Sequence, residues 1–199
     1  MTYEAAGSSV NAIDNRFVAA PNDPAASERA QRLRALGFGT VPDPEFDELA
    51  AKIARTAGTP YAMVNFVLDT HQFFAGLYEA PAAGAGALEA ATQAAAQGSV
   101  NRTMDLDYGF CPHVVDIKHA LVLDDVCAWP RFAGNPVVDE LGVRSYIGAP
   151  LFDREGTVLG TVCAISTRQS TWGTPGVEMI KSMADEVMDL IKRRELGGS

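Results

Sequence analysis

The feature that most constrains the fold is a pair of apolar segments joined by a short polar turn. Residues 146–152 and 157–165 are rich in β-branched, aromatic and other apolar residues, a composition that favours strands. The turn between them begins with Asp153 and ends with Gly156, residue types that tight turns use because one caps the backbone and the other tolerates positive φ. This pattern predicts a β-hairpin, and therefore a sheet at the centre of the domain.

A second hairpin is expected earlier in the chain. Residues 61–68 (YAMVNFVL) are almost all apolar and rich in strand-forming residues, as in a central strand buried on both faces. Residues 71–77 (HQFFAGL) follow as the partner strand. The two hairpins together supply four predicted strands.

Two helices are predicted before the first hairpin. Asp-Pro pairs at 23–24 and 43–44 each place an N-cap residue before a proline, a common way to begin a helix. The first helix is expected to stop at Gly37 and the second at Gly58. The second helix carries one apolar stripe at helical spacing, made of Phe46, Leu49, Ala50, Ile53 and Ala57.

The last helix is predicted over residues 174–195, beginning at Thr174-Pro175. Apolar side chains recur along it every three or four residues, at Val177, Ile180, Ala184, Val187 and Ile191. Two heptads are too few for a coiled coil on their own. We therefore expect this helix to cover the sheet or to pair with a second copy, forming a homodimer through the terminal helices.

Composition divides the chain into an arm, a domain and an insertion. Residues 1–22 are small and polar, as in a flexible N-terminal arm, and residues 23–199 are long enough for a single domain with a buried core. Within that domain, residues 79–103 are dominated by alanine and glycine, and such small side chains bury too little area to offset their ordering. We expect this segment to be a mobile insertion.

The charge balance excludes several classes of partner. The 199 residues carry a net charge of −9, which opposes binding to nucleic acid or anionic lipid, since both need clustered Lys and Arg. We find no apolar stretch of about 20 residues that could span a membrane, and no export signal at the N-terminus. Three widely spaced cysteines suit reduced thiols better than a disulfide framework. These observations predict a cytoplasmic protein with neither nucleic acid nor membrane as a partner.

The region from Gly109 to Ser166 contains four short motifs. In order, they are FC-x-H, RF-x-x-NP-x-V, Y-x-GAPL and G-x-x-LGT-x-C. Their arrangement resembles the GAF domain, a bacterial small-molecule sensing module. The resemblance implies an α+β, GAF/PAS-like fold with a central antiparallel sheet of about five or six strands. It also implies N- and C-terminal helices on one face and a cap of loops and helices, residues 103–144, on the other.

The same resemblance implies a non-enzymatic sensory module that binds a small molecule and signals through a protein partner or a dimer. By position, the ligand would contact His113, Asp125, Trp129, Phe132, Arg144 and Tyr146. An aromatic cage with a few polar groups is the usual composition of a small-molecule site. The alternative is that these side chains only shape the cap. The sequence requires no cofactor, and no ligand can be named from it.

The cysteines leave other functions open. Cys111, two residues before His113, fits either structural packing or redox sensing, while Cys163 in a predicted core strand is expected to be buried and inert. Cys127, in a loop, is expected to be accessible. Enzymes of GAF fold reduce free methionine sulfoxide with cysteines, so Cys111 and Cys127 would be catalytic in that alternative. No close pairing of ligands predicts a metal site. A ligand-free dimerisation scaffold, which a collapsed pocket would favour, is the third possibility.

Overall fold

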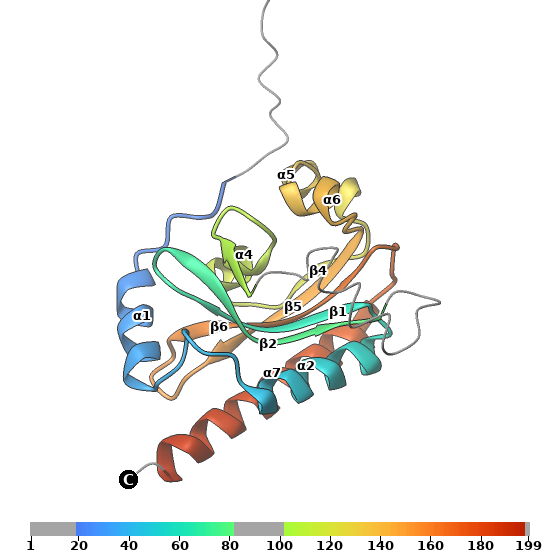
Figure 1. Ribbon diagram of the computed structural model, residues 1–199. Helices are drawn as coiled ribbons and strands as arrows, with labels where there is room; N and C mark the ends of the chain where they lie inside the picture. Colours follow the sequence, from blue (N-terminus) through green and yellow to red (C-terminus); the bar gives the residue numbers. More distant parts are fainter. Residues whose placement is uncertain (1–18, 82–101, 198–199) are drawn as a thin grey trace, which may run out of the picture.

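The computed structural model describes residues 19–81 and 102–197, which form a six-stranded antiparallel sheet with helices on both faces (Figure 1). The strands lie in the order β3-β2-β1-β6-β5-β4. Their bounds are β1 Tyr61–Val67, β2 His71–Glu79, β3 Thr103–Asp105, β4 Leu121–Leu123, β5 Ser145–Phe152 and β6 Val158–Ser166. The predicted α+β class with a central antiparallel sheet is confirmed.

Both predicted hairpins are present, β1 with β2 and β5 with β6. The two hairpins join where β1 lies beside β6, with Met63 opposite Cys163 and Asn65 opposite Thr161. Because side chains alternate between the faces of a strand, these four residues share one face of the sheet. The centre of that face is therefore built from residues about 100 positions apart in the sequence.

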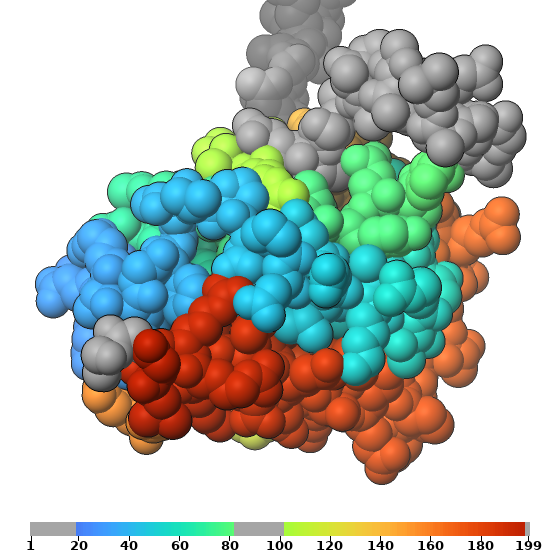
Figure 2. All heavy atoms as spheres, turned by 60° about the horizontal axis from the view of Figure 1, so that its bottom comes forward, coloured from blue at the N-terminus to red at the C-terminus, as the bar shows by residue number. Residues whose placement is uncertain are grey.

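Helices α2 (Pro44–Ala57) and α7 (Gly173–Gly197) lie side by side on the other face (Figures 1 and 2). As expected, Asp43 caps α2 by accepting a hydrogen bond from the Glu45 amide, 2.9 Å away, and Gly58 ends the helix at a positive φ of 67°. The apolar faces of both helices pack on the sheet in the largest buried cluster of the described residues, which includes Phe46, Ile53, Ile180, Val187 and Ile191.

Helix α1 (Ala26–Ala35) lies at one end of the sheet, beside the turns of both hairpins (Figure 1). Its buried Arg29 donates from Nε to the carbonyl oxygen of Val67 at 2.6 Å, and Arg32 pairs with Asp153 at 3.2 Å. The expected start at the 23–24 pair is wrong by two residues. Asp23 accepts a hydrogen bond from the Ala25 amide at 3.0 Å and forms a separate turn before the helix.

A cap covers the face of the sheet opposite α2 and α7, and it is made of short elements that follow β3. They are α4 (Cys111–Ile117), the 3-10 helix η1 (Val126–Ala128), α5 (Pro130–Ala133) and α6 (Pro136–Glu140). A second buried cluster joins this cap to the sheet, and it includes Met63, Phe74, Phe110, Val126 and Tyr146. The cap and the α2–α7 pair thus cover opposite faces of one sheet.

Parts of two expected segments lie outside the described residues. These are 1–18 of the predicted arm and 82–101 of the predicted insertion. At the described end of the arm, the Ala20 amide donates to Asp107 Oδ1 at 2.7 Å. Within 19–81 and 102–197, none of the helices combines the length and apolar character that crossing a membrane requires.

Candidate functional site

The interior between sheet and cap contains a cavity of about 30 Å³. This volume suits one water-sized molecule. Its walls come from β1, β2, β3, β5 and β6, from the turn before α4 and the first residue of α4, and from α6 and the residues that follow it. The lining residues are Met63, Gln72, Phe74, Met104, Gly109, Phe110, Cys111, Val137, Leu141, Val143, Tyr146 and Ile165. A larger ligand can therefore enter this interior only if the cap moves.

Polar side chains lie under the cap among these apolar walls. Asn65 donates from Nδ2 to Gln72 Oε1 at 2.9 Å, and Gln72 Nε2 donates to the carbonyl oxygens of Asp105 and Tyr108 at 2.8 and 2.7 Å. Gln72 therefore ties β2 to β3 and to the turn that follows. Both Asn65 and Gln72 are buried, so this network stands in a region of low dielectric, where its bonds are strong.

Two buried oxygens in this interior lack a hydrogen-bond partner among the described residues. They are Asn65 Oδ1 and Thr161 Oγ1, from residues directly opposite each other on β1 and β6. A buried polar group without a partner costs about 1 to 3 kcal/mol. Such groups are rare in folded proteins, and they commonly mark a site where a water, ion or ligand binds.

Cys111 lies at the contact between the cap and the sheet. Its Sγ is 3.4 Å from the Tyr146 hydroxyl and 3.8 Å from Cys163 Sγ, and all three residues are buried. The pKa of Cys111 is lowered to about 6, chiefly by the hydrogen bond between its sulfur and that of Cys163; Thr161, Tyr146 and Asn65 act in the same direction, and burial opposes them. The pKa of Cys163 is raised by the same contact and by burial.

His113 is 3% exposed and lies beneath Arg131. The guanidinium Nη2 is 3.3 Å from Nδ1 of the imidazole. Because a guanidinium only donates, Nδ1 must accept and the ring is neutral. Burial, followed by the charge of Arg131, lowers the pKa of His113 to about 4. The ring also meets Phe132 edge-on at 5.2 Å, so His113 and Phe132 pack together inside the cap.

Asn135 holds the cap elements together. Its Oδ1 accepts from the amides of Gly109 at 2.9 Å and Val137 at 3.3 Å, and its Nδ2 donates to the carbonyl oxygens of Asp107 and Gly109 at 3.2 and 3.0 Å. One buried side chain thus joins the turn before α4 to the first turn of α6. Asn135 was expected only as part of the motif that shapes this loop, and it forms that structural contact.

The other residues expected at the ligand site lie at the rim of the cap. Asp125 pairs with Arg144 at 3.1 Å and also accepts from the Cys127 amide at the same distance. Trp129, the residue before α5, is 52% exposed, and Cys127 is exposed on η1. None of these four side chains lines the cavity described above, whereas Tyr146 does.

The residues that sequence reasoning missed are Asn65, Gln72 and Thr161. A signal for them existed. Each is a polar residue inside an apolar strand, and Thr161 is two positions before Cys163, so these two face the same side. What the pattern could not show was that Asn65 and Thr161 are neighbours across β1 and β6.

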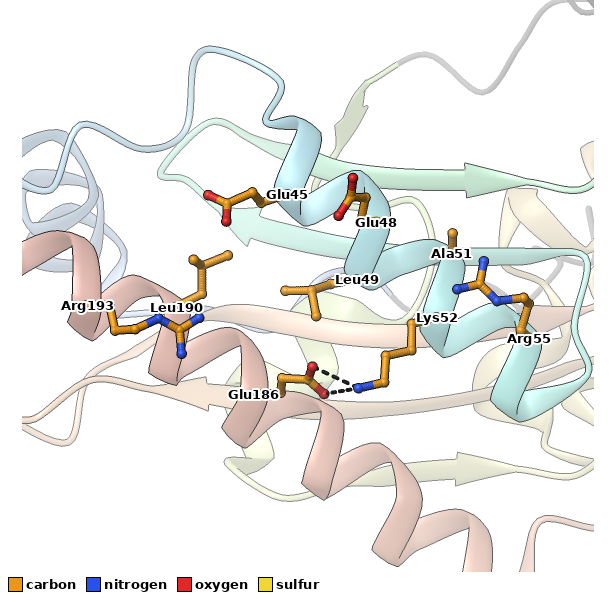
Figure 3. A pocket seen from close by; sticks show the side chains of 9 residues that line it. All are labelled: Glu45, Glu48, Leu49, Ala51, Lys52, Arg55, Glu186, Leu190 and Arg193. Atoms are coloured by element: carbon orange, nitrogen blue, oxygen red, sulfur yellow. Dashed lines mark hydrogen bonds and ion pairs between the residues drawn. The ribbon is translucent and has the colours of Figure 1, made fainter.

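A second hollow lies on the opposite side of the molecule, between α2 and α7 (Figure 3). Its volume is about 440 Å³. Leu49 and Leu190 lie toward the middle of the groove, and charged side chains surround them, including Lys52 and Glu186, which pair at 2.7 Å. This groove is open and mixed in charge, unlike the interior beneath the cap. Among the described residues, no cluster of His, Cys, Asp or Glu is arranged to hold a metal ion.

A six-stranded antiparallel sheet, with two helices on one face and a cap over a partly polar interior on the other, defines an α+β domain. The sequence matches the family model of the GAF domain over residues 42–191, and the chain belongs to that family. GAF domains bind small molecules and take part in signalling, which agrees with an enclosed interior.

Three known proteins show the range of this similarity. The chain is 28% identical over 124 residues, 62% of its own length, to a cyclic di-GMP phosphodiesterase of Pseudomonas aeruginosa, and it spans only 18% of that protein. The free methionine-R-sulfoxide reductase of Neisseria meningitidis superposes with a TM-score of 0.58 at 17% identity, covering 91% of this chain and 98% of the reductase. The GAF domain of a Coxiella burnetii phosphoenolpyruvate-protein phosphotransferase superposes with a TM-score of 0.57 at 10% identity, covering 86% of this chain and 95% of that domain. These structural likenesses show the fold.

Proposed function

We propose that this domain is a non-enzymatic, cytoplasmic sensory module that binds a small molecule between the sheet and the cap. The observation that carries the proposal is the pair of buried, unpartnered oxygens on Asn65 and Thr161. Both lie on the face of the sheet that the cap covers, and both are near enough to Cys111 to influence the pKa of its thiol. A bound molecule that donates a hydrogen bond to them would remove the cost of leaving them unpaired.

The lining limits the chemistry of that molecule. Apart from Gln72, whose amide is already bonded, the cavity walls are apolar or aromatic side chains, a thiol and the Tyr146 hydroxyl. The Asn65 and Thr161 oxygens are not part of this lining, but they lie on the same face of the sheet and offer acceptors, and the Thr161 hydroxyl can also donate. A small, neutral and largely apolar molecule with at least one donor group therefore fits best. His113 and Phe132 would support the site from inside the cap, because they pack behind Phe110.

The fold offers a direct route from cap to helix. Asp124, at the end of β4, accepts from the Trp172 amide at 3.0 Å, and its own carbonyl oxygen accepts from the Ser170 amide at the same distance. Trp172 immediately precedes α7. A ligand that favours an open cap would therefore displace the start of α7, and it can do so only by the difference in its affinity for the two states.

The α2–α7 face would transmit that change to a second copy or a protein partner. Its groove presents Glu48 beside Lys52 and Arg55 (Figure 3), and mixed charge of this kind can be self-complementary across a two-fold axis. Arg55→Glu should weaken the homodimer, measured by sedimentation. Arg168→Glu, in the loop between β6 and α7, is the matched control. A dimer that both variants leave intact would place the interface elsewhere.

Native mass spectrometry tests the proposed ligand site. The freshly purified protein should carry extra mass that disappears on denaturation, and Thr161→Val should lower its occupancy several-fold while Thr56→Val, on the exposed side of α2, should not. A wild-type mass equal to the polypeptide alone, together with no thermal stabilisation by a panel of amino acids, nucleotides and organic acids, would contradict small-molecule binding.

Two alternatives each have one observation in their favour. The lowered pKa of Cys111 favours a thiol enzyme that reduces free methionine sulfoxide. Such an enzyme should turn over free methionine sulfoxide, and Cys111→Ser or Cys127→Ser should abolish that turnover. The cavity of about 30 Å³ favours a ligand-free dimerisation scaffold. The scaffold predicts that Thr161→Val changes neither bound mass nor the oligomeric state.

A further inference from the structure

The buried thiols of Cys111 and Cys163 form a pair that the sensory function described above does not use. Their sulfur atoms are 3.8 Å apart, and Cys163 Sγ also lies 3.8 Å from the sulfur of Met63. Cys163 is on β6 in the middle of the sheet, whereas Cys111 begins a short helix of the cap. We propose that Cys111 and Cys163 are a redox-active dithiol that a hydroperoxide converts to a disulfide.

The geometry permits this bond with a small movement. A disulfide has sulfur atoms about 2.05 Å apart, so a gap of roughly 1.8 Å must close from the 3.8 Å separation. Cys163 is held between β1 and β5 by ladder hydrogen bonds on both sides. The movement must therefore come from α4, which would be drawn against the sheet.

The surroundings distinguish the roles of the two sulfurs. The Tyr146 hydroxyl, 3.4 Å from Cys111 Sγ, can donate to a thiolate there, and the pKa of Cys111 is lowered while that of Cys163 is raised. Because the thiolate is the nucleophile, Cys111 is the attacking residue and Cys163 the resolving residue. Cys111 also lines the 30 Å³ cavity, which leaves room for a molecule about the size of water next to its sulfur.

The chemistry balances in two steps. The Cys111 thiolate attacks one oxygen of the hydroperoxide, the O–O bond breaks, and the second oxygen leaves with a proton as water or an alcohol. Cys111 is then a sulfenic acid. The sulfur of Cys163 attacks the sulfur of Cys111, the S–S bond forms, and hydroxide leaves with the proton of Cys163 as water. Two thiols lose two electrons, and one peroxide is reduced.

Peptide mapping tests the pair directly. The full-length reduced protein is treated with one equivalent of hydrogen peroxide, the remaining thiols are alkylated, and the peptides are analysed without reduction. Wild type and Cys127→Ser should both give a Cys111–Cys163 cross-link that dithiothreitol reverses. In Cys163→Ser, dimedone should instead trap a sulfenic acid on Cys111.

The unfolded chain provides the control for native geometry. The cross-link should form at least tenfold faster in the folded protein than in urea, because only folding brings the two sulfurs together. Oxidation confined to the exposed Cys127, or a Cys111–Cys163 cross-link that forms only in urea, would overturn the proposal. The small-molecule site is tested separately, by the bound mass of the reduced protein.

Discussion

The hydroxyl of Tyr146 lies 3.4 Å from Cys111 Sγ, so β5 of the sheet and α4 of the cap meet at a buried polar contact. Tyr146 is on β5 and Cys111 begins α4, and both residues line the cavity between the two layers. The same tyrosine ring packs edge-on against Phe110 at 5.1 Å. Tyr146 therefore combines apolar packing with a hydrogen bond that fixes the position of α4.

Removing this hydroxyl should loosen the cap without disturbing the sheet. In Tyr146→Phe the ring keeps its contact with Phe110, but Cys111 loses one of its two hydrogen-bond partners. We expect a loss of about 1 kcal/mol in the free energy of unfolding, measured by urea titration. The pKa of Cys111 should also rise, because the tyrosine helps to lower it. Tyr78→Phe, at a half-buried position of β2, is the control; equal effects from the two variants would argue against this contact.

The side chain of Asn135 should contribute strongly to the stability of the folded protein. Asn135→Ala removes the four hydrogen bonds that join the turn before α4 to α6 and leaves buried backbone groups without partners. The expected loss is about 1 to 3 kcal/mol in the free energy of unfolding. The exposed Asn22→Ala should be neutral. A wild-type melting curve for Asn135→Ala would contradict the structural role assigned to this side chain.

Acid should weaken the packing around His113. Its pKa is lowered from 6.5 to about 4, so between these values the unfolded chain binds more protons than the folded protein. Stability is therefore complete above pH 6.5 and is lost as the pH falls toward 4. Between pH 7 and pH 5 we expect a loss of about 2 kcal/mol that His113→Gln abolishes. The exposed His119→Gln should keep the wild-type pH dependence, and an unchanged slope in His113→Gln would refute the assignment.

Asp43 has two separable roles. It caps α2 and also pairs with Arg194 of α7, which lowers its pKa. Asp43→Ala should cost about 1 to 2 kcal/mol, whereas Asp43→Asn keeps a capping oxygen and should cost less than half of that. Thermal denaturation of both variants and of Arg194→Met measures the two contributions. If Asn and Ala at this position are equally damaging, the ion pair rather than the cap dominates.

Elements governed by local signals could be predicted from the sequence. The 153–156 turn joins β5 to β6 as expected, and α2 begins and ends where Asp43 and Gly58 indicate. These predictions depend on capping and on backbone conformation, which neighbouring residues determine. The start of α1 was misplaced because Asp23 accepts a hydrogen bond from the Ala25 amide in a turn that precedes the helix. Aspartate is common both at helix N-caps and in such turns, so the residue type alone does not distinguish them.

The candidate site depends on contacts that local patterns do not contain. Asn65 and Thr161 meet only because β1 pairs with β6 in one particular register, and a shift of one residue would turn both side chains to the other face. Cys163 was expected to be buried and inert; burial is confirmed, but its distance from Cys111 depends on how α4 docks. Conversely, Trp129 is half exposed because it precedes α5 while Phe132 supplies the inward side chain.

Hydrogen exchange followed by mass spectrometry tests most directly whether the cap opens over the sheet. If ligand entry proceeds by cap movement, the amides of α4 and α6 should exchange through an opening that costs at least about 2 kcal/mol less than exchange in β1, β6 and α7. The sheet and α7 should then open only with global unfolding. A cap whose amides exchange with the same free energy as the central strands would contradict this mechanism of sensing.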